Sequence, residues 1–527
     1  MPTGPTVVLA GIAGGAGRYR SDVPTSRSVL TDQLSWSVRE VGRAVDTAAL
    51  FEALFGAEPV AFWLDSSLAV PGLSRISVLG TTAGPDAEVL VRDVADGDVF
   101  AELWSRLATR VTAGPPPRLP FTGGYVGWFG YELKALTGGA AVHTSPAPDA
   151  LWIWANRFAV VDPVLDRTWL VVVHNDLGRA GAEDWLAAAE RVATRDDVVG
   201  REGAAGGSAV LDDGVRREGA AGGSAVLDEG VRQEGAAGGS GVRDGGVPLI
   251  AGLDIESRLE LPREQYLVAI GRVREALEAG ESYEVCLTNR VRLPAVPDPL
   301  GFYLWQRRRN PAPYAAFIRY GDLAVASSSP ERFLTVDADG WAECRPIKGT
   351  APRSADPEED RAAAKRLAAD EKTRAENLMI ADLIRNDLGR VCEPGTMRVP
   401  KLMAVESYAT MHQLVTTVRG RLRAGVDALE AVRACFPPGS MTGAPKIRTM
   451  EIIDELEPSA RGVYSGALGY LGLDGQADLS VVIRTAVMTR QETVVGAGGA
   501  IVLDSVAEDE YDEMLLKATA AVRGRDA

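Results

Sequence analysis

The segments VYSGALGYLG (463–472), DLSVVIRTAVM (478–488) and TVVGAGGAIVL (493–503) predict three consecutive β-strands. An Asp474-Gly475 pair between the first two is typical of a tight hairpin turn. A helix from about 506 to 523 then closes the chain. This block indicates an antiparallel sheet packed against a helix, and the rest of the chain extends the pattern in both directions.

Toward the N-terminus the same kind of signal recurs. Short apolar runs separated by turn residues predict further antiparallel strands in VAFWLDSS (60–67), SRISVLG (74–80), FTGGYVGWFGYEL (121–133), LWIWANRFAVV (151–161) and TWLVVVHND (168–176). Their alternation places Trp152 and Trp154 in the core rather than on a ligand platform. Between 260 and 460 we expect helices at 263–279, 357–387, 427–435 and 446–456, with strands at 283–293 and 314–335.

An octapeptide interrupts these elements: REGAAGGS occurs at 201–208 and 217–224, and QEGAAGGS occurs at 233–240. Gly, Ala, Ser and charged residues offer almost nothing to bury, so the composition favours a linker or exposed loop over a solenoid. We therefore divide the chain into an N-terminal region at 30–196, a low-complexity insertion at 197–248 and a C-terminal region at 249–524.

Composition excludes several functions. The formal net charge of −16 repels nucleic acids and anionic membrane surfaces, and no segment has the long uncharged run of a membrane span. The four cysteines lie far apart, which favours a reducing compartment. We expect a cytoplasmic protein without nucleic-acid or membrane partners, and a hard cation such as Mg²⁺ if a metal is bound.

Several side chains could carry chemistry. Glu510, Glu513 and Lys517 share one helix face, although their spacing alone favours a solvated Glu-to-Lys pair. Glu376 lies at the edge of an apolar stripe. Lys348, held between Pro346-Ile347 and Gly349, is a nucleophile if burial or a nearby cation lowers its pKa, but composition favours an exposed turn. GSMTGAPK (439–446) and GAGGA (496–500) suit either anion binding or tight structural turns.

Seven motifs in this order resemble the chorismate-utilising enzymes: SSSPERF (327–333), RPIKGTAPR (345–353), RAENLMIADLIRNDLGRV (374–391), ESYATMHQLVT (406–416), FPPGSMTGAPK (436–446), YSGALGY (464–470) and GAGGAIVLDS with EYDEMLLKA (510–518). The resemblance implies an α+β fold in which two stacked antiparallel sheets are flanked by helices. It also implies that N- and C-terminal segments interleave.

The resemblance further implies roles for individual residues. Glu376 and Glu513 match Mg²⁺ ligands, with Glu510 as an auxiliary carboxylate, and Glu331 matches the acid that protonates the departing C4 hydroxyl of chorismate. Tyr464 and Arg484 match the residues that bind the enolpyruvyl carboxylate. The substrate pocket is completed by Lys517, Gly443, Ala444, Gly498 and Gly499, and His412 matches a histidine beside the ring.

Two positions distinguish activities within the family. Isochorismate and salicylate synthases have a water-activating lysine where this chain has Glu284, so water is disfavoured as the nucleophile. PIKGT in place of PIAGT is characteristic of aminodeoxychorismate synthases, which implies that Lys348 attacks ring C2 and that ammonia then enters at C4. The expected product is 4-amino-4-deoxychorismate for 4-aminobenzoate and folate synthesis. No glutaminase motif surrounds a cysteine, which predicts a separate glutamine amidotransferase subunit as the ammonia source.

Three alternatives stay open at this point. The first is an anthranilate synthase component I. The second is an enzyme that makes 4-amino-4-deoxychorismate for a secondary-metabolite pathway instead of for folate. The third is a catalytically inactive binding or regulatory subunit. Two departures from the family pattern carry no assigned role: Thr373, where relatives often have an acidic residue, and Glu284.

Overall fold

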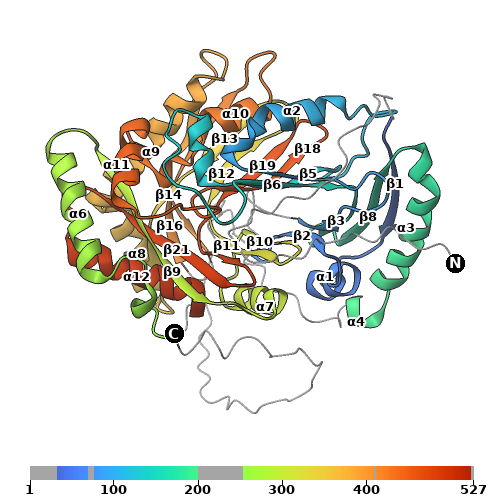
Figure 1. Cartoon of the computed structure of the whole chain (residues 1–527), viewed down its shortest axis with the longest axis horizontal. Helices are drawn as coiled ribbons and strands as arrows, with labels where there is room; N and C mark the ends of the chain where they lie inside the picture. The colour runs from blue at the N-terminus through green and yellow to red at the C-terminus, as the bar shows by residue number, and fades with distance from the viewer. Residues whose placement is uncertain (1–32, 69–75, 200–252, 409–410, 524–527) are drawn as a thin grey trace, which may run out of the picture.

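Two antiparallel β-sheets stacked on each other form the body of the molecule, with helices on the outside (Figure 1). The computed structural model describes residues 33–68, 76–199, 253–408 and 411–523. Within these residues the fold is α+β, as the family resemblance implies.

The first sheet has eleven strands in the order β1 (Ser35–Val41), β8 (Arg167–His174), β7 (Arg157–Asp162), β3 (Ser77–Thr81), β2 (Val60–Asp65), β10 (Tyr314–Tyr320), β11 (Leu323–Ser329), β20 (Thr485–Met488), β21 (Glu492–Ile501), β9 (Glu284–Pro294) and β17 (Gly443–Ala444). N-terminal strands join C-terminal ones where β2 pairs with β10, Ala61 opposite Arg319. The predicted interleaving is therefore confirmed in this sheet.

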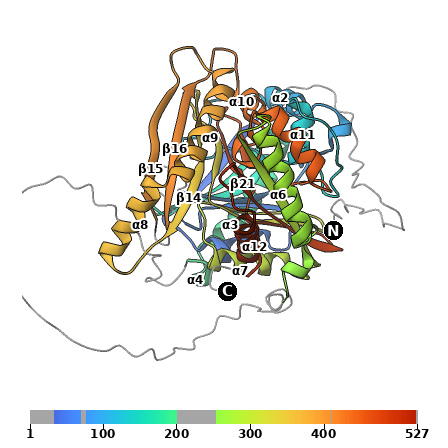
Figure 2. The ribbon, with the colours of Figure 1, turned by 90° about the vertical axis from the view of Figure 1, so that its left-hand side faces the viewer.

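The second sheet has ten strands. Its order is β14 (Ile347–Pro352), β16 (Met411–Arg421), β13 (Trp341–Arg345), β12 (Arg332–Val336), β19 (Ala477–Val481), β18 (Ala467–Gly472), β5 (Gly124–Phe129), β6 (Ala150–Ala155) and β4 (Val89–Arg92), with β15 (Arg398–Ser407) paired to β16. Figure 2 shows the β15–β16 hairpin as a long projection beside the helices. Here too the two halves of the chain meet, at β18 and β5.

Central strands of the eleven-stranded sheet, such as β3 and β11, are buried on both faces, whereas the edge strand β1 is partly exposed. In β10, Ala316 and Ile318 point into the core between the sheets, whereas Phe317 points into a second core. The second core is covered by helices α1 (Thr47–Phe55), α3 (Arg179–Ala193), α6 (Arg263–Glu278), α7 (Pro299–Arg309) and α12 (Ala507–Arg523). Double burial explains why these strands read as continuous apolar runs rather than as alternating ones.

The chain crosses from one sheet to the other within two segments that sequence analysis read as single strands. β6 and β7 are separated only by Asn156, whose buried side chain hydrogen-bonds both the N–H and the C=O of Ala83. β19 and β20 are separated by residues 482–484, and Arg484 there has a φ of 51°. The prediction of one continuous strand at 478–488 is therefore wrong. Arg484 lies in the short connection by which the chain passes from one sheet to the other.

The prediction of one long helix at 357–387 is also wrong, because the helix is interrupted at Asp370. The structure has two helices, α8 (Pro357–Ala369) and α9 (Glu371–Gly389), because Asp370 is extended with a ψ of 114°. Its carboxylate accepts the N–H of Thr373 at 2.7 Å and so caps the second helix. The other predicted helices correspond to α6, α10 (Ala428–Cys435), α11 (Lys446–Leu456) and α12.

Two further expectations concern the core and the insertion. Trp152 and Trp154 are fully buried, which confirms them as core residues. The GAAGGS repeats lie outside the described residues, so the proposed division at 197–248 stays a prediction. Among helices in the described part of the chain, none has the length and apolar character needed to cross a membrane.

Candidate active site

A buried lysine lies where the two sheets and a helix meet. Lys348, in β14 of the ten-stranded sheet, is only 9% exposed, so the exposed turn that composition favoured is wrong. Its Nζ donates to Oε1 of Glu284 at 2.5 Å and lies 4.0 Å from Oε2 of Glu376. Glu284 begins β9 in the other sheet, and Glu376 lies on α9.

The pKa of Lys348 is raised, whereas a lysine that is to be a free nucleophile requires a lowered pKa. Burial lowers the pKa of Lys348, but the carboxylates of Glu284 and Glu376 outweigh burial, and the net pKa is raised. The lysine is therefore an ammonium in this arrangement. It becomes a nucleophile only after passing a proton to a neighbouring base, and Oε1 of Glu284 is in contact with it.

Glu331 provides a buried acid beside this lysine. It follows β11 and is 6% exposed. Burial raises the pKa of Glu331 to about 7, although a hydrogen bond to the Ser440 hydroxyl and the charges of Lys348 and Arg484 act in the opposite direction. A carboxyl group with that pKa is protonated in a large fraction of molecules at neutral pH, as a proton donor must be.

Glu376 and Glu510 both lie within 4.0 Å of the same cation. The ammonium of Lys372 is 2.7 Å from Oε1 of Glu510 and 4.0 Å from Oε1 of Glu376. Burial raises the pKa of Glu376 to about 6, against the charge of Lys348. Glu510, 3% exposed, also accepts a hydrogen bond from Ser505. The first turn of α9 and the start of α12 thus face each other.

Glu513 and Lys517 form the i,i+4 ion pair that their spacing favoured. The two charged groups are 2.7 Å apart with side chains 52% and 42% exposed. Burial tends to raise the pKa of Glu513, but Lys517 outweighs it and the net pKa is lowered. Lys517 also donates to the C=O of Gly498 at 3.0 Å, so α12 is tied to the GAGGA segment of β21.

The donor set around Lys372 fits a hard cation. Within the described ranges, no three acidic, histidine or cysteine side chains form a ready-made metal cluster. Nevertheless, Glu376 and Glu510 share one ammonium group, which stands in for a cation between their oxygens. Mg²⁺ commonly takes one or two protein carboxylates and completes its shell with water and substrate oxygens. Residues Glu376 and Glu510 are therefore suited to hold it, with Glu513 on the next turn.

Tyr464 is placed by the glycine-rich strand β21. The tyrosine is 5% exposed, and a Cβ on Gly496 would lie 2.3 Å from two of its ring carbons. Only a glycine allows this contact. Gly499 lies near α12 but is less tightly packed, because a Cβ there would lie 3.3 Å from Oε2 of Glu510 and 3.9 Å from Nζ of Lys517.

The GSMTGAPK loop contacts the start of β9, next to Glu284, through its backbone. Gly443 and Ala444 form β17, which pairs with Val285 and Glu284 of β9. Gly443 has a φ of 138°, and a Cβ would lie 1.9 Å from the C=O of Glu284. Lys446 anchors the loop, since its Nζ donates to Asp387 and to two backbone carbonyls.

His412 has its ring nitrogens hydrogen-bonded to Ser407 and Asp360 and not to the other predicted site residues. It lies on β16 opposite Ala351 of β14 and is 2% exposed. Nδ1 hydrogen-bonds Ser407 at 2.7 Å, and Nε2 hydrogen-bonds Asp360 of α8 at 3.0 Å. Both ring nitrogens are thus engaged beside α8, and a catalytic role for His412 stays a prediction.

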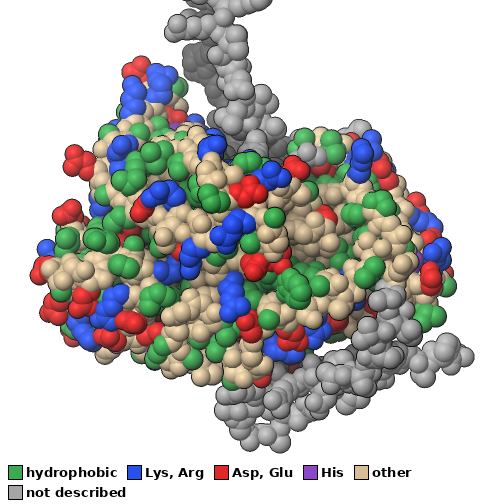
Figure 3. Space-filling model, turned by 90° about the horizontal axis from the view of Figure 1, so that it is seen from above, with side chains coloured by type: hydrophobic (Ala, Val, Ile, Leu, Met, Phe, Trp, Pro, Cys, Tyr) green, Lys and Arg blue, Asp and Glu red, His purple; other side chains and the backbone are tan. Residues whose placement is uncertain are grey.

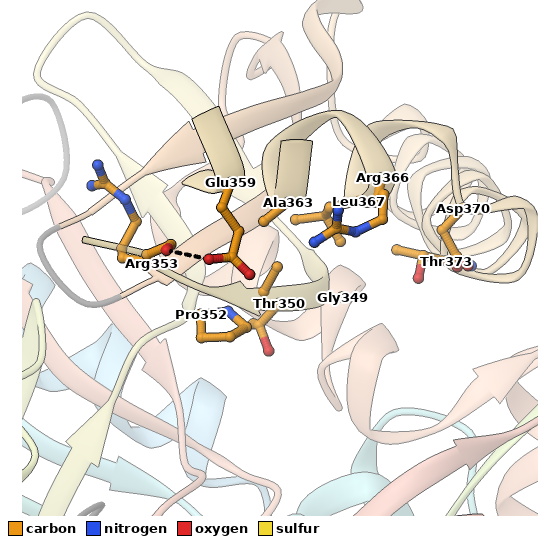
Figure 4. Close-up of a pocket in the computed structure, with 12 residues that line it drawn as sticks. Gly349, Thr350, Pro352, Arg353, Glu359, Ala363, Arg366, Leu367, Asp370 and Thr373 are labelled. Carbon is orange, nitrogen blue, oxygen red and sulfur yellow. Dashed lines mark hydrogen bonds between the residues drawn. The ribbon is translucent and has the colours of Figure 1, made fainter. Parts of the chain in front are cut away.

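A cavity of about 580 Å³ adjoins this region (Figure 4). It lies between β14 and α8, where Glu359 accepts a hydrogen bond from Ser354 across its edge. Gly349, the residue after Lys348, is in its wall. So is Thr373, which lies one helical turn before Glu376. The cavity is beside the Lys348 cluster, and none of the predicted catalytic or metal-binding side chains lines it.

Sequence analysis missed a buried network that supports Tyr464. Arg461, 5% exposed, pairs with Glu457 at 2.6 Å and donates to the carbonyls of Met441 and Cys286. Glu132, from the N-terminal half, accepts the N–H groups of Arg461 and Gly462. The Glu457-x₃-Arg461 spacing, which ends three residues before Tyr464, was the available signal. Burial of the pair could not be read from it.

The molecular surface carries charges of both signs. On the face that Figure 3 shows, Lys and Arg side chains are interspersed with Asp and Glu, without a continuous basic area. The side chains of Lys348, Glu284 and Glu331 are instead buried, where the lower dielectric makes charge interactions stronger.

A solved structure shares this architecture. Anthranilate synthase component I from Streptococcus pneumoniae TIGR4 superposes with a TM-score of 0.66 at 26% identity, over 86% of this chain and 93% of that one. The fold is therefore the one found in anthranilate synthase component I. The pattern of the chorismate binding enzyme family matches residues 253–523, and the chain belongs to that family.

Curated relatives include proteins with two different names. An aminodeoxychorismate synthase from Streptomyces pristinaespiralis is 45% identical over 500 residues, which is 91% of this chain but 64% of that protein. An anthranilate synthase component 1 from Streptomyces coelicolor is 34% identical over 92% of this chain and 88% of its own length. The chain thus spans less than two thirds of the first of these relatives.

Proposed function

We propose that the protein is an aminodeoxychorismate synthase that converts chorismate and ammonia into 4-amino-4-deoxychorismate, the precursor of 4-aminobenzoate and folate. The observation that carries this proposal is the buried Lys348, which lies within 4.0 Å of both Glu284 and Glu376 and beside the acid Glu331. The higher identity to an aminodeoxychorismate synthase than to an anthranilate synthase supports the same choice.

In the first step, Lys348 replaces the hydroxyl group of chorismate indirectly. After Nζ has passed a proton to Glu284, its lone pair forms a bond to ring C2, the two ring double bonds shift, and the C4–O bond breaks. Glu331 donates the proton with which the hydroxyl leaves as water. A pKa of about 7 suits Glu331 to this donation near neutral pH.

In the second step, ammonia takes the C4 position. Its lone pair forms the C4–N bond, the double bonds shift back, and the C2–N bond breaks with its electron pair returning to Lys348. The C4 ammonium group then loses one proton. Two successive displacements place nitrogen at C4, whereas direct attack at C2 would give the anthranilate skeleton.

Two groups of residues account for substrate binding in this proposal. Glu376, Glu510 and Glu513 would hold Mg²⁺, which supplies positive charge for the ring carboxylate. The enolpyruvyl carboxylate is assigned to Tyr464 and Arg484, and Arg484 lies at the crossover between the sheets. Lys517 and the backbone of Gly443, Ala444, Gly498 and Gly499 complete the pocket.

Ammonia is proposed to come from a separate glutamine amidotransferase subunit. All four cysteines of the chain are buried, with exposed fractions of 2% to 4%, at positions 286, 344, 392 and 435. Burial raises the pKa of Cys286, and it raises the pKa of Cys392 to about 11. Neither thiol is therefore readily deprotonated to a nucleophilic thiolate. Glutamine-dependent turnover by the purified chain alone would contradict this assignment.

Product identification tests the proposed function. The purified chain is incubated with chorismate, Mg²⁺ and an ammonium salt, with and without an added aminodeoxychorismate lyase, and the products are separated and weighed by mass spectrometry. We expect 4-aminobenzoate only when the lyase is present. Anthranilate formed without the lyase would replace the proposal by anthranilate synthase, while the fold and family assignments would stand.

A further inference from the structure

The carboxylate of Glu284 is only half engaged. Its side chain is completely buried, and Oε1 accepts the hydrogen bond from Lys348. Oε2 is buried as well, but it has no hydrogen-bond partner among the described residues. The same carboxylate is therefore hydrogen-bonded to the proposed nucleophile through one oxygen, while its other oxygen is buried without a partner in the described part of the chain.

An unpartnered oxygen of this kind indicates a ligand. Leaving a buried acceptor unsatisfied is unfavourable, more so for a charged group, and buried polar atoms in folded proteins nearly always have a partner. The neighbours of Glu284 are fixed: its backbone is paired with Ala444 of β17, and Lys348 occupies Oε1. A small donor molecule is what this position lacks.

We infer that Oε2 of Glu284 is the binding position for the incoming ammonia. This inference deepens the proposed function and rests on it. The ligand class is a small N–H donor, and the position is adjacent to the lysine that ammonia must displace. Ammonia satisfies the orphaned oxygen by donating one of its N–H groups.

The chemistry of the acceptor explains why a glutamate suits ammonia. A carboxylate only accepts hydrogen bonds, so it holds ammonia by its N–H groups and leaves the nitrogen lone pair free to attack carbon. A lysine ammonium only donates, and it would engage that lone pair instead. Oε2 stays an acceptor whether or not Oε1 has received the proton of Lys348.

A partition experiment tests the inference. The lysine adduct is captured at C4 either by ammonia, which gives the amine, or by water, which regenerates chorismate. With Mg²⁺, ammonium chloride and ¹⁸O-labelled water, mass spectrometry measures the ratio of amine to ¹⁸O-labelled chorismate. We expect Glu284→Gln to shift this ratio toward water by roughly 10-fold or more, since an amide N–H donor then takes the place of the acceptor Oε2 beside the ammonia.

The ratio separates ammonia binding from simple support of Lys348. If Glu284 only positions the lysine, or if Oε2 holds only a structural water, both products decrease together and the ratio stays within about 2-fold of the wild type, which overturns the inference. Should Glu284→Gln be inactive, Glu284→Asp is measured instead. It keeps a carboxylate opposite Lys348 but withdraws it by one methylene, and the same shift is expected.

A matched control comes from a second buried pair. Asp454 lies 2.7 Å from Lys134, with side chains 7% and 2% exposed, and neither residue is among the predicted catalytic or binding residues. Asp454→Asn removes a lysine-paired carboxylate of the same kind and is expected to leave the product ratio unchanged. A wild-type enzyme that makes no amine at C4 would refute the proposed function itself, before any variant is compared.

Discussion

At the scale of single residues, glutamates of the same kind differ because their surroundings differ. Burial raises the pKa of Glu331 to about 7 and that of Glu376 to about 6, whereas the pKa of Glu513 is lowered because Lys517 outweighs burial. Environments that separate pKa values in this way commonly divide acid and ligand roles. Glu331 is thus suited to donate a proton and Glu513 to remain an anion.

Lys348→Arg isolates the nucleophilic role of the lysine. The guanidinium keeps the positive charge opposite Glu284 and Glu376, so the fold is expected to persist, but it cannot lose a proton near neutral pH and does not attack carbon. We expect kcat for amination to fall by roughly 1000-fold or more, with chorismate still bound. Steady-state kinetics and chorismate titration check both parts. Amination at the wild-type rate would exclude a covalent lysine.

The pKa of Glu331 predicts a pH dependence. Because the acid form must donate, and its pKa is about 7, kcat at saturating ammonia should decrease as the pH rises above about 7. In Glu331→Gln we expect a kcat lower by about 100-fold or more and without that decrease. Rate measurements from pH 6 to 9 provide the comparison. An identical descending limb in the variant would assign it to another group.

At the scale of elements, the close contact between β21 and the loop of Tyr464 leaves no room for a side chain. A Cβ on Gly496 would lie 2.3 Å from the tyrosine ring. Gly496→Ala should therefore displace Tyr464, raise KM for chorismate by about 10-fold, and lower the free energy of unfolding by about 1 to 3 kcal/mol. Thermal melting and kinetics measure both effects.

Gly271→Ala is the control for that substitution. Gly271 lies on α6, and a Cβ there would have no heavy atom within 4 Å. Alanine is preferred over glycine inside a helix by about 0.5 to 1 kcal/mol, so the variant should be at least as stable as the wild type. It should leave KM unchanged. Equal effects of the two variants would show that the Gly496 result is unrelated to Tyr464.

The support that Glu132 gives to the turn before Tyr464 also depends on pH. Burial, with the charge of Asp149, raises the pKa of Glu132 to about 7 against its two N–H donors. A raised carboxyl pKa contributes stability that is complete below about pH 4.5 and is lost as the pH rises through 7. From pH 5 to 8, the free energy of unfolding of the wild type minus that of Glu132→Gln should therefore fall by up to about 3 kcal/mol. Denaturant unfolding at both pH values tests this, and a constant difference would contradict it.

Local elements were largely predictable from sequence, but their breaks were not. Helices α6, α10, α11 and α12 follow from apolar periodicity and caps. The break at Asp370 and the crossing at residues 482–484 were missed, because an aspartate inside a helical pattern and an arginine inside a strand pattern carry no strong local signal. Tertiary packing decides both positions.

At the scale of the whole molecule, the pairings that build the site join residues far apart in the chain. β2 pairs with β10, and Glu132 supports Arg461, across the insertion. Periodicity cannot specify such partners, so the interleaving of the two halves came only from the family resemblance, and the strand order became known only from the structure. The resemblance also supplied Glu331 and the roles of Lys348 and Glu376, whereas composition alone favoured an exposed lysine. The half-engaged carboxylate of Glu284 became visible only in three dimensions.

The most direct test of the account is to look for the covalent intermediate on the whole protein. The wild type is mixed with chorismate and Mg²⁺ without ammonia, quenched in acid within a turnover, and analysed by intact mass and peptide mapping. We expect a mass gain equal to chorismate minus water on the peptide containing Lys348, and its disappearance when ammonium is added before quenching. An enzyme that aminates chorismate at C4 without any adduct on Lys348 would contradict the account.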